Sequence, residues 1–289
     1  MADRRAMNRL ALILAFGLAC NPWVAAQAQT SVVEQGIHER LTQVRNCVIS
    51  VARVDTAGGV AKIAATHGTA FLIGNRGFAL TAKHVIAGKS KPLAALTMAE
   101  AGGWTWNKIV ASEMHPSEDV AIIKLNASSC RSGFQLSSSV EMASSRYRIY
   151  GYPGDATRFE TARGEFPDLV YTEGYIRRRY SASLYPSAEP SATAGTSQVT
   201  EALQISGTGF FELSQIAGTG TSGEPVFDLA DPMQVIGIYS AEKHTPHVIQ
   251  MGGQPVTQLT SVSYAVRDDA FRNWKPAMLG GKTVLEESQ

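Results

Sequence analysis

The stretch GTGTSGEPVFDL, residues 218–229, surrounds one hydroxyl group, that of Ser222, with glycines. Such a composition is typical of a turn, because Gly, Thr and Ser tolerate unusual backbone angles or hydrogen-bond their own backbone. Glycines also allow consecutive N–H groups to converge on one point beside a nucleophile, which would form an oxyanion site. Taken alone, the stretch favours a turn, and the second interpretation requires a base and an acid elsewhere.

Two further stretches supply candidates for that base and that acid. Of the six histidines, only His84, in FALTAKHVIAG, follows an apolar strand directly and sits among small residues. Asp119, in HPSEDVAIIKL, precedes an apolar run, so its carboxylate would lie at the edge of a core and need a hydrogen-bond partner. A serine becomes a nucleophile only with a base in reach, and that base needs an orienting acid. Each residue alone is common at a strand end, but the order His, Asp, Ser in these local sequences is much less common.

The composition is that of an ordinary globular protein. Of the 289 residues, 44% are hydrophobic and 18% are charged, and the net charge is +1. The hydrophobic fraction is large enough for a sizeable core. A charge so close to zero indicates neither nucleic acid nor an anionic membrane as a partner. Since no CxxC motif and no clustered His/Cys spacing occurs, we expect no metal ion and no other cofactor.

The first 28 residues are typical of a secretory signal peptide. A cluster of arginines precedes the apolar segment Leu10–Ala19, which is too short to span a bilayer. A small-x-small sequence ends at Ala28. We therefore expect cleavage after Ala28 and export of residues 29–289 to the periplasm or the medium, with no stable membrane span after cleavage.

The cysteines leave two questions open. Cys20, in GLAC, could be a lipoprotein acceptor, but Gly17 stands where a larger aliphatic residue is usual. Loss of the signal peptide leaves Cys47 and Cys130. In an oxidising compartment these two can pair as a disulfide, or they can be buried free thiols that behave as small hydrophobes.

The elements that must position these residues are mostly short strands. Runs rich in β-branched and aromatic residues are bounded by Gly, Pro, Asn or Asp, which favours antiparallel sheets in a sandwich or a barrel. Helical patterns occur only at residues 31–44 and 267–278, and residues 185–198 form a Ser/Ala/Pro/Gly-rich loop. The expected strands are 46–54, 68–85, 106–114, 119–125, 147–154, 169–180, 201–213, 225–241 and 260–267.

Three segments of the chain resemble those of a known family. LTAKHV, EDVAIIKL and GTGTSGEPVF are similar to the three signature segments of chymotrypsin-like (trypsin-fold) serine peptidases, in that family's order, and are most similar to its bacterial exported branch. The resemblance spans roughly Cys47 to Arg267. It implies an all-β fold of two antiparallel six-stranded β-barrels with the active site between them, as lobes of about 45–140 and 141–270, and a short C-terminal helix.

The resemblance also implies roles for individual residues. Ser222 would be the nucleophile of a peptide-bond hydrolysis, His84 the general base, and Asp119 the acid that orients the imidazole. The oxyanion hole would be the N–H groups of Gly220 and Ser222. Ser240 matches a serine that often supports the aspartate, although a plain strand hydroxyl is about as common there. The family also has disulfides similar to Cys47–Cys130.

Specificity follows from the same resemblance. Ile216, six residues before the serine, would form the floor of the pocket for the side chain preceding the scissile bond, with Tyr239, Ser240 and Ala241 in the substrate-binding strand. An aliphatic floor offers no counter-charge, and Tyr239 replaces a histidine used by glutamyl endopeptidases, so we expect small or medium apolar side chains to be preferred. An inward-facing Glu242 could accept a cationic side chain and would overturn this expected preference, but solvent-facing Glu is more common.

Some features depart from the family pattern. Glu224 stands where a glycine is usual, and Thr221 replaces the aspartate that pairs with a new amino terminus in zymogen-type members. The 23 residues after Val266 (289 − 266) hold no peptide-binding domain of the Deg type.

The main alternative is a catalytically silent exported protein that keeps the fold and binds a partner. An α/β-hydrolase is disfavoured because its chain order places His last. The sequence does not indicate an oligomeric state.

Overall fold

The computed structural model describes the chain in several stretches. They are residues 41–55, 62–87, 92–98, 104–128, 130–139, 141–153, 169–181, 207–215, 217–218, 220–231, 233–252 and 254–289. The chain divides into two compact units, Met1–Val44 and Arg45–Gln289. Only residues 41–44 of the first unit are described, and they are helical. The second unit contains every strand named below.

Six strands close into a first barrel, in the order β1-β2-β3-β6-β5-β4. All neighbouring pairs in this ring are antiparallel, and a one-turn helix, α3 (Lys83–Ile86), follows β3 directly. The strands are β1 (Val48–Asp55), β2 (Lys62–Ile73), β3 (Phe78–Thr81), β4 (Leu93–Met98), β5 (Trp104–Met114) and β6 (Ala121–Leu125).

A second sheet of seven strands has the order β11-β8-β9-β10-β13-β12-β7, and pairing of β11 with β12 closes six of them into a second barrel. Its core is apolar and aromatic, with Tyr147, Phe211 and Tyr239 among the buried residues. The strands are β7 (Gln135–Leu136), β8 (Arg146–Gly151), β9 (Val170–Tyr180), β10 (Phe210–Leu213), β11 (Pro225–Asp228), β12 (Gln234–Met251) and β13 (Gln254–Arg267).

The two barrels and the short C-terminal helix, α4 (Val284–Ser288), confirm the predicted fold class. Two of its strands were not among those expected. Strand β7 is additional and pairs in parallel with β12. Strand β4 has the sequence LAALTM, whose Ala, Leu and Met are good helix formers, so propensity did not mark it as a strand. Its place between β1 and β5 decides its conformation.

The predicted helix over 267–278 is wrong. The structure has two single turns of 3-10 helix there, η3 (Asp268–Ala270) and η4 (Ala277–Leu279). Pro276 lies between them, and proline disfavours helical angles at the preceding residue and cannot donate a helical hydrogen bond. A regular helix begins only at Val284, where Thr283 and Glu286 form a reciprocal capping box.

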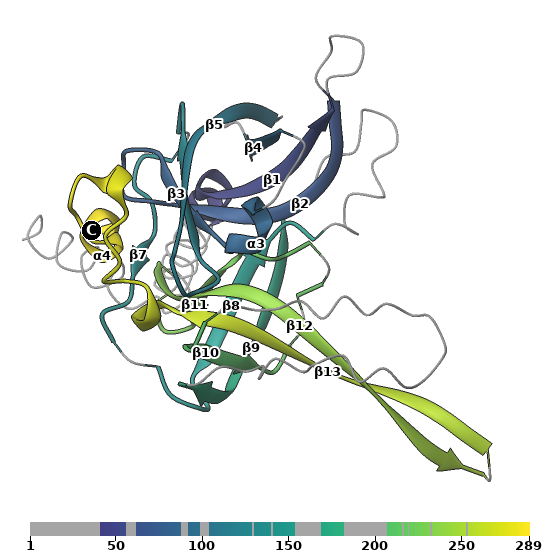
Figure 1. Ribbon diagram of the computed structural model, residues 1–289. Coiled ribbons are helices and arrows are strands. Elements are labelled where there is room, and N and C mark those ends of the chain that lie inside the picture. Colours follow the sequence, from purple (N-terminus) through teal and green to yellow (C-terminus); the bar gives the residue numbers. More distant parts are fainter. Residues whose placement is uncertain are drawn as a thin grey trace, which may run out of the picture. The chain divides into compact units, whose positions relative to one another are not determined.

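The C-terminal segment returns from the second barrel to the first. The N–H groups of Ala277 and Met278 donate to the carboxylate of Glu113 in β5, at 2.9 and 3.2 Å. Farther along, the buried carboxylate of Glu287 binds Arg76 in the β2–β3 turn. This segment therefore ties the two barrels together on the side marked by α4 in Figure 1.

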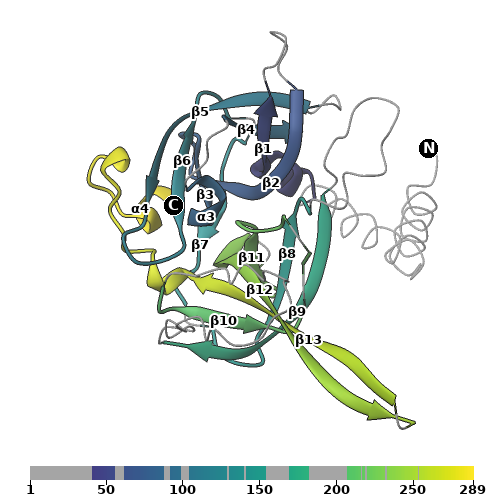
Figure 2. The ribbon, with the colours of Figure 1, turned by 45° about the vertical axis from the view of Figure 1, so that its right-hand side comes forward.

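Strands β12 and β13 are much longer than the barrel requires. Their pairing continues from Gly237↔Arg267 to Met251↔Gln254, and the ends of both strands leave the second barrel as a two-stranded ribbon (Figures 1 and 2). The sequence interpretation ended the first of these strands at residue 241 and began the second at 260. It missed the outer half of the ribbon because prolines and a Gly-Gly pair interrupt the strand pattern there.

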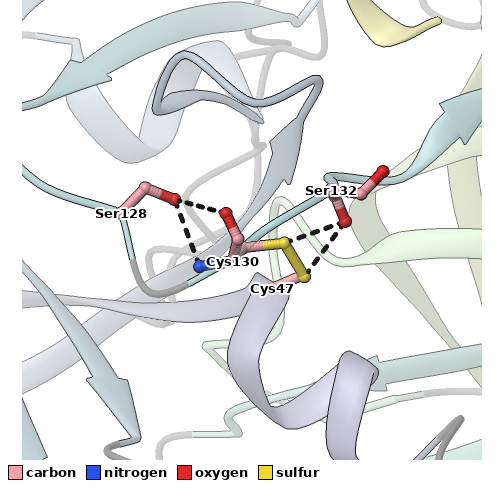
Figure 3. Close-up of a disulfide and its surroundings, with 4 residues drawn as sticks. All are labelled: Cys47, Ser128, Cys130 and Ser132. Atoms are coloured by element: carbon pink, nitrogen blue, oxygen red, sulfur yellow. Dashed lines mark hydrogen bonds between the residues drawn. A yellow bond between two sulfur atoms is a disulfide. The ribbon is translucent and has the colours of Figure 1, made fainter.

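A disulfide joins Cys47 to Cys130 (Figure 3). Cys47 ends the helical segment before β1, and Cys130 lies in the connection that follows β6. The hydroxyl of Ser128 donates to the Cys130 carbonyl and accepts from the Cys130 N–H, both at 3.2 Å. Of the two states that the sequence left open, the structure has the disulfide, which fixes the start of the first barrel to the connection after its last strand.

No helix in the described stretches has both the length and the apolar character needed to cross a membrane.

Candidate active site

His84 and Asp119 meet because their strands pair. Strand β3 lies beside β6, with Thr81 opposite Ala121, so the residues just after β3 and just before β6 are brought to the same end of the first barrel. His84 Nδ1 lies 2.8 Å from Asp119 Oδ2, and the His84 backbone N–H donates to Oδ1 at 3.0 Å. The carboxylate is almost fully buried, at 5% exposure, whereas the imidazole is one-third exposed. Two contacts therefore fix both the position and the orientation of the imidazole.

Ser240, in β12 of the second barrel, completes the environment of the aspartate. Its hydroxyl donates to Asp119 Oδ2 at 2.5 Å. The Ser240 carbonyl in turn accepts from Ser222 Oγ at 3.2 Å. A continuous chain of contacts thus runs from His84 through Asp119 and Ser240 to Ser222. Within the described residues, the Ser222 hydroxyl bonds to this carbonyl and not to the imidazole.

The turn that carries Ser222 is bent by glycines. Gly218, Gly220 and Gly223 all have positive φ angles, of 104°, 89° and 94°. Gly223 also has no room for a side chain, since a Cβ there would lie 2.0 Å from the carbonyl oxygen of Thr69. The Thr69 N–H donates to the Ser222 carbonyl at 2.8 Å. The nucleophile candidate is therefore pressed against strand β2 of the first barrel.

Two N–H groups in this turn remain available. In the described part of the chain, the N–H groups of Gly220 and Ser222 have no hydrogen-bond acceptor, and both residues are partly exposed. The turn is held by other contacts. Thr221 Oγ1 donates to the Gly218 carbonyl at 2.6 Å, and the Gly223 N–H donates to the Tyr239 carbonyl at 2.8 Å. A turn held in this way can present two donors to a developing oxyanion.

Glu242 is turned inward, not toward solvent. Its Oε1 accepts from the Tyr239 hydroxyl at 2.6 Å and from the Gly218 N–H at 2.9 Å. The expectation of a solvent-facing Glu242 is therefore wrong, and the argument for a preference for apolar side chains, which depended on it, no longer holds. Tyr239 is buried under these contacts, and burial together with the Glu242 charge raises its pKa. Ala241 is buried beside them, whereas Ile216 lies outside the described residues.

Glu224 is a buried carboxyl that the sequence did not mark as part of the site. It lies two residues after Ser222 and is 2% exposed. A Cβ built at Gly151 would lie 1.6 Å from Glu224 Oε1, so the carboxyl occupies the space that Gly151 leaves open. Burial raises the pKa of Glu224 well above its usual range, and the charge of Glu242 adds to this. Because the shift favours the uncharged form, the carboxyl is protonated over a wider pH range than an ordinary glutamate.

Two further contacts hold the Asp119 side of the site. The carboxylate of Glu118 accepts from the N–H of Thr208, at 3.0 Å to Oε2, which links the first barrel to the start of β10. Lys83 Nζ donates to the His115 carbonyl at 3.1 Å and so ties α3 to the segment before Asp119. The adjacent acidic pair Glu118–Asp119 in front of an apolar run was the available signal in the sequence.

A family model described as the trypsin-like peptidase domain matches residues 68–238, more than half of the chain. A search among curated proteins found no match. Among solved structures, the fold is similar to that of the active form of the Rv3671c protease from M. tuberculosis, with a TM-score of 0.50 and 16% identity over 80% of each chain.

Two other solved structures are similar in fold. Deg5 has a TM-score of 0.50 and 15% identity, with 82% of this chain and 90% of that chain covered. The HtrA-type protease AlgW with a decapeptide also has a TM-score of 0.50, with 16% identity, over 86% of this chain and 67% of that chain. At such low identity these likenesses establish the fold.

Proposed function

The chain belongs to the trypsin-like peptidases, a family of serine endopeptidases, and we propose that it hydrolyses peptide bonds through an acyl-enzyme formed on Ser222. The observation that carries this proposal is the double contact of His84 with the buried Asp119 carboxylate. A carboxylate on Nδ1 leaves Nε2 as the basic nitrogen of the ring, which is the state that a general base requires.

Each step uses a residue of this chain. Ser222 Oγ attacks the carbonyl carbon of the scissile bond while His84 Nε2 takes the hydroxyl proton. The oxyanion accepts from the N–H groups of Gly220 and Ser222. The carbon–nitrogen bond then breaks, His84 gives its proton to the leaving amine, and Ser222 holds the acyl group as an ester. Water activated by His84 hydrolyses the ester and restores the hydroxyl. The first step requires Ser222 to turn from the Ser240 carbonyl to the imidazole, and rotamer changes of that kind are fast.

A second function has one observation in its favour. A catalytically silent protein of this fold could keep the Ser222 hydroxyl on the Ser240 carbonyl, where it bonds in this structure. Such a protein would bind peptides without cleaving them. The two functions differ in whether Ser222 can form a covalent bond.

Labelling with a fluorophosphonate, which reacts with activated serines, tests the proposal. We expect the parent protein to be labelled on Ser222 and to cleave casein, and Ser222→Ala to do neither while unfolding at the same urea concentration. Ser128→Ala, which removes a serine outside the site, is the matched control and should be labelled like the parent. A parent protein that is folded but neither labelled nor active would establish the silent alternative.

We further propose that residues 1–28 are removed as a signal peptide and that residues 29–289 act outside the cytoplasm as one peptidase domain with lobes of about 45–140 and 141–270. The disulfide Cys47–Cys130 supports an oxidising destination. Amino-terminal sequencing of the exported protein should find Gln29 first. Retention of Cys20 with a lipid on it would instead support the lipoprotein alternative.

A further inference from the structure

The connection between β5 and β6 carries Asp119, and its shape depends on the side chain of its first residue, His115. The two strands pair as far as Met114 and Ala121, so the residues between these positions lie outside the ladder. A backbone bond closes the connection, from the His115 N–H to the Val120 carbonyl at 2.8 Å. The N–H groups inside it need other acceptors, because a buried backbone donor without a partner costs free energy.

The imidazole of His115 is the acceptor for two of these groups. Its Nδ1 accepts from the N–H of Glu118 at 2.9 Å and from the N–H of Ser117 at 3.3 Å. A neutral imidazole has one N–H donor and one bare nitrogen that accepts. Since Nδ1 is the acceptor here, the proton lies on Nε2. The two bonds fold the chain around the ring directly before Asp119.

Two neighbouring elements hold His115 in place. The ring of Trp274, in the C-terminal segment, packs against the imidazole with the ring centroids 5.1 Å apart and the planes at 75°. From α3, Lys83 Nζ donates to the His115 carbonyl at 3.1 Å. His115 is almost fully buried, at 8% exposure. The imidazole is therefore a fixed support for the turn around it.

That turn is joined directly to the candidate catalytic residues. Asp119 follows Glu118, whose N–H is one of the two bonded to the imidazole. The Asp119 carboxylate contacts both Nδ1 and the backbone N–H of His84, and Asp119 must keep its place for both contacts to form. The Glu118 carboxylate fixes the same part of the turn by accepting from the Thr208 N–H. A change in the turn would therefore displace the acid that orients His84.

We propose that His115 is a positioning residue for Asp119, and that its neutral imidazole keeps the turn in the shape in which Asp119 holds His84. The proposal rests on the peptidase function proposed above. It gives the site a second acid-sensitive group besides His84. A protonated imidazole carries N–H donors on both nitrogens, so Nδ1 of His115 could no longer accept from the two backbone N–H groups. The turn would then open, and Asp119 would lose its place.

The surroundings of His115 oppose this protonation. Burial lowers the pKa of the imidazole most, the charge of Glu118 raises it, and the charge of Lys83 lowers it. The ring packed against it, that of Trp274, carries no charge. His115 therefore stays neutral in the folded protein to below about pH 6.5, the ordinary pKa of histidine. Because the unfolded chain takes up this proton first, the free energy of unfolding falls as pH drops from about 6.5 toward the lower pKa of the folded protein.

The tautomer of His115 can be measured without any catalytic activity. Long-range ¹H–¹⁵N NMR of the full chain with labelled histidines distinguishes protonated ring nitrogens from bare ones. The spectrum of His115→Asn lacks one imidazole and so identifies the His115 signals. At pH 8 we expect a bare Nδ1 and a protonated Nε2. A proton on Nδ1 at this pH would overturn the proposal.

The pH profile of activity tests the positioning role. In the conservative variant His115→Asn, the side-chain oxygen can accept from nearby backbone N–H groups, as Asn does in turns, but it does not titrate. At pH 8 we expect its kcat/KM to lie within about threefold of the parent value, since acceptor bonds of ordinary strength are kept. At acid pH, the logarithm of kcat/KM should fall with a slope approaching two protons in the parent, from His84 and His115, and with a slope of one in the variant. Equal slopes would contradict the proposal.

His115→Leu removes the acceptor and keeps an apolar side chain against Trp274. We expect its kcat at pH 8 to fall by about 10²-fold with little change in KM, because a displacement of about 1 Å at a positioning group has an effect of this size. A variant that is folded by urea unfolding and keeps the parent kcat would refute the positioning role. If this variant does not fold, the slopes of the parent and His115→Asn decide. If the parent itself is folded but neither labelled nor active, the proposed function fails, and the tautomer of His115 still decides whether its ring holds the turn.

Discussion

The two barrels contribute to the site in different ways. In the first barrel, His84 and Asp119 are held by direct contacts with each other, and the pairing of β3 with β6 brings them together. In the second barrel, Ser222 lies in a turn whose shape depends on glycines with positive φ and on side chains distant in sequence, such as Glu242. The acid and base are positioned by strand register, whereas the nucleophile is positioned by tertiary packing. Substitutions in the first barrel should therefore mainly lower kcat, whereas substitutions in the Ser222 turn of the second barrel should mainly lower stability.

On the first-barrel side, the largest expected effect is on chemistry with the fold preserved. Asp119→Asn keeps an oxygen for the His84 N–H but loses the carboxylate that selects the tautomer of the imidazole. We expect kcat to fall by about 10⁴-fold, as removal of this charge does in Ser-His-Asp sites, with little change in KM. Steady-state kinetics on a peptide substrate measures this.

Ser240→Ala is the matched control, because it removes a donor to the same carboxylate and leaves the charge. Its kcat should fall far less than that of Asp119→Asn. Similar kcat values for the two variants would mean that hydrogen bonding to Asp119, and not its charge, carries the effect.

On the second-barrel side, the next largest effect is on stability. Gly223→Ala forces a positive φ on an L-residue and drives a Cβ to within 2.0 Å of the Thr69 carbonyl. Strain and overpacking together should lower the free energy of unfolding by roughly 2–5 kcal/mol. Gly252→Ala, at the ribbon tip, has a φ of 60° but nothing within 4 Å of the new Cβ. It should cost about 1 kcal/mol, and equal losses in urea unfolding would contradict the role given to close packing.

The difference between the barrels also explains what could be predicted from the sequence. Most strands and the acid–base candidates follow from patterns within a few residues of each side chain, as in EDVAIIKL before β6. The two-barrel class follows from the resemblance of three such segments to a known family, because the strand pattern alone left a sandwich and a barrel open. The structure brings His84, Asp119, Ser240 and Ser222 into one chain of contacts, but the bond from Ser222 to the Ser240 carbonyl depends on a rotamer that no sequence pattern specifies. The inward turn of Glu242 likewise depends on the Tyr239 hydroxyl and the Gly218 N–H, which meet only in the folded chain.

Glu224 shows the same limit, since a glutamate after a glycine gives no sign of burial. Its raised pKa makes a smaller, pH-dependent prediction. As pH rises above about 4.3, the ordinary pKa of glutamate, the unfolded chain releases this proton while the folded protein keeps it, so the free energy of unfolding falls. The Gln side chain of Glu224→Gln does not titrate, so the free energy of unfolding of this variant does not fall for this reason.

We therefore expect the free energies of unfolding of the parent and of Glu224→Gln to differ least near pH 4. As pH rises toward 8, the free energy of unfolding of the variant should increase relative to that of the parent. The slope is about 1.4 kcal/mol per pH unit wherever the folded protein holds one proton more than the unfolded chain. Urea unfolding at several pH values measures it. A difference that does not change with pH would show that the folded carboxyl titrates like an ordinary glutamate.

The smallest expected effect on activity is that of the position of the amino terminus, and it concerns how the second barrel orders the Ser222 turn. Thr221 cannot form an ion pair with a new terminal ammonium, but its hydroxyl fixes the Gly218 carbonyl while Glu242 fixes the Gly218 N–H. Both backbone polar groups of Gly218 are thus held by the second barrel itself, so the turn needs no cleavage to become ordered. A protein that begins several residues before Gln29 should have the same kcat/KM as one that begins at Gln29, and both should lose activity with Thr221→Val, which removes the hydroxyl. A large rise in activity on trimming would show that an amino terminus, and not these two side chains, orders the Ser222 turn.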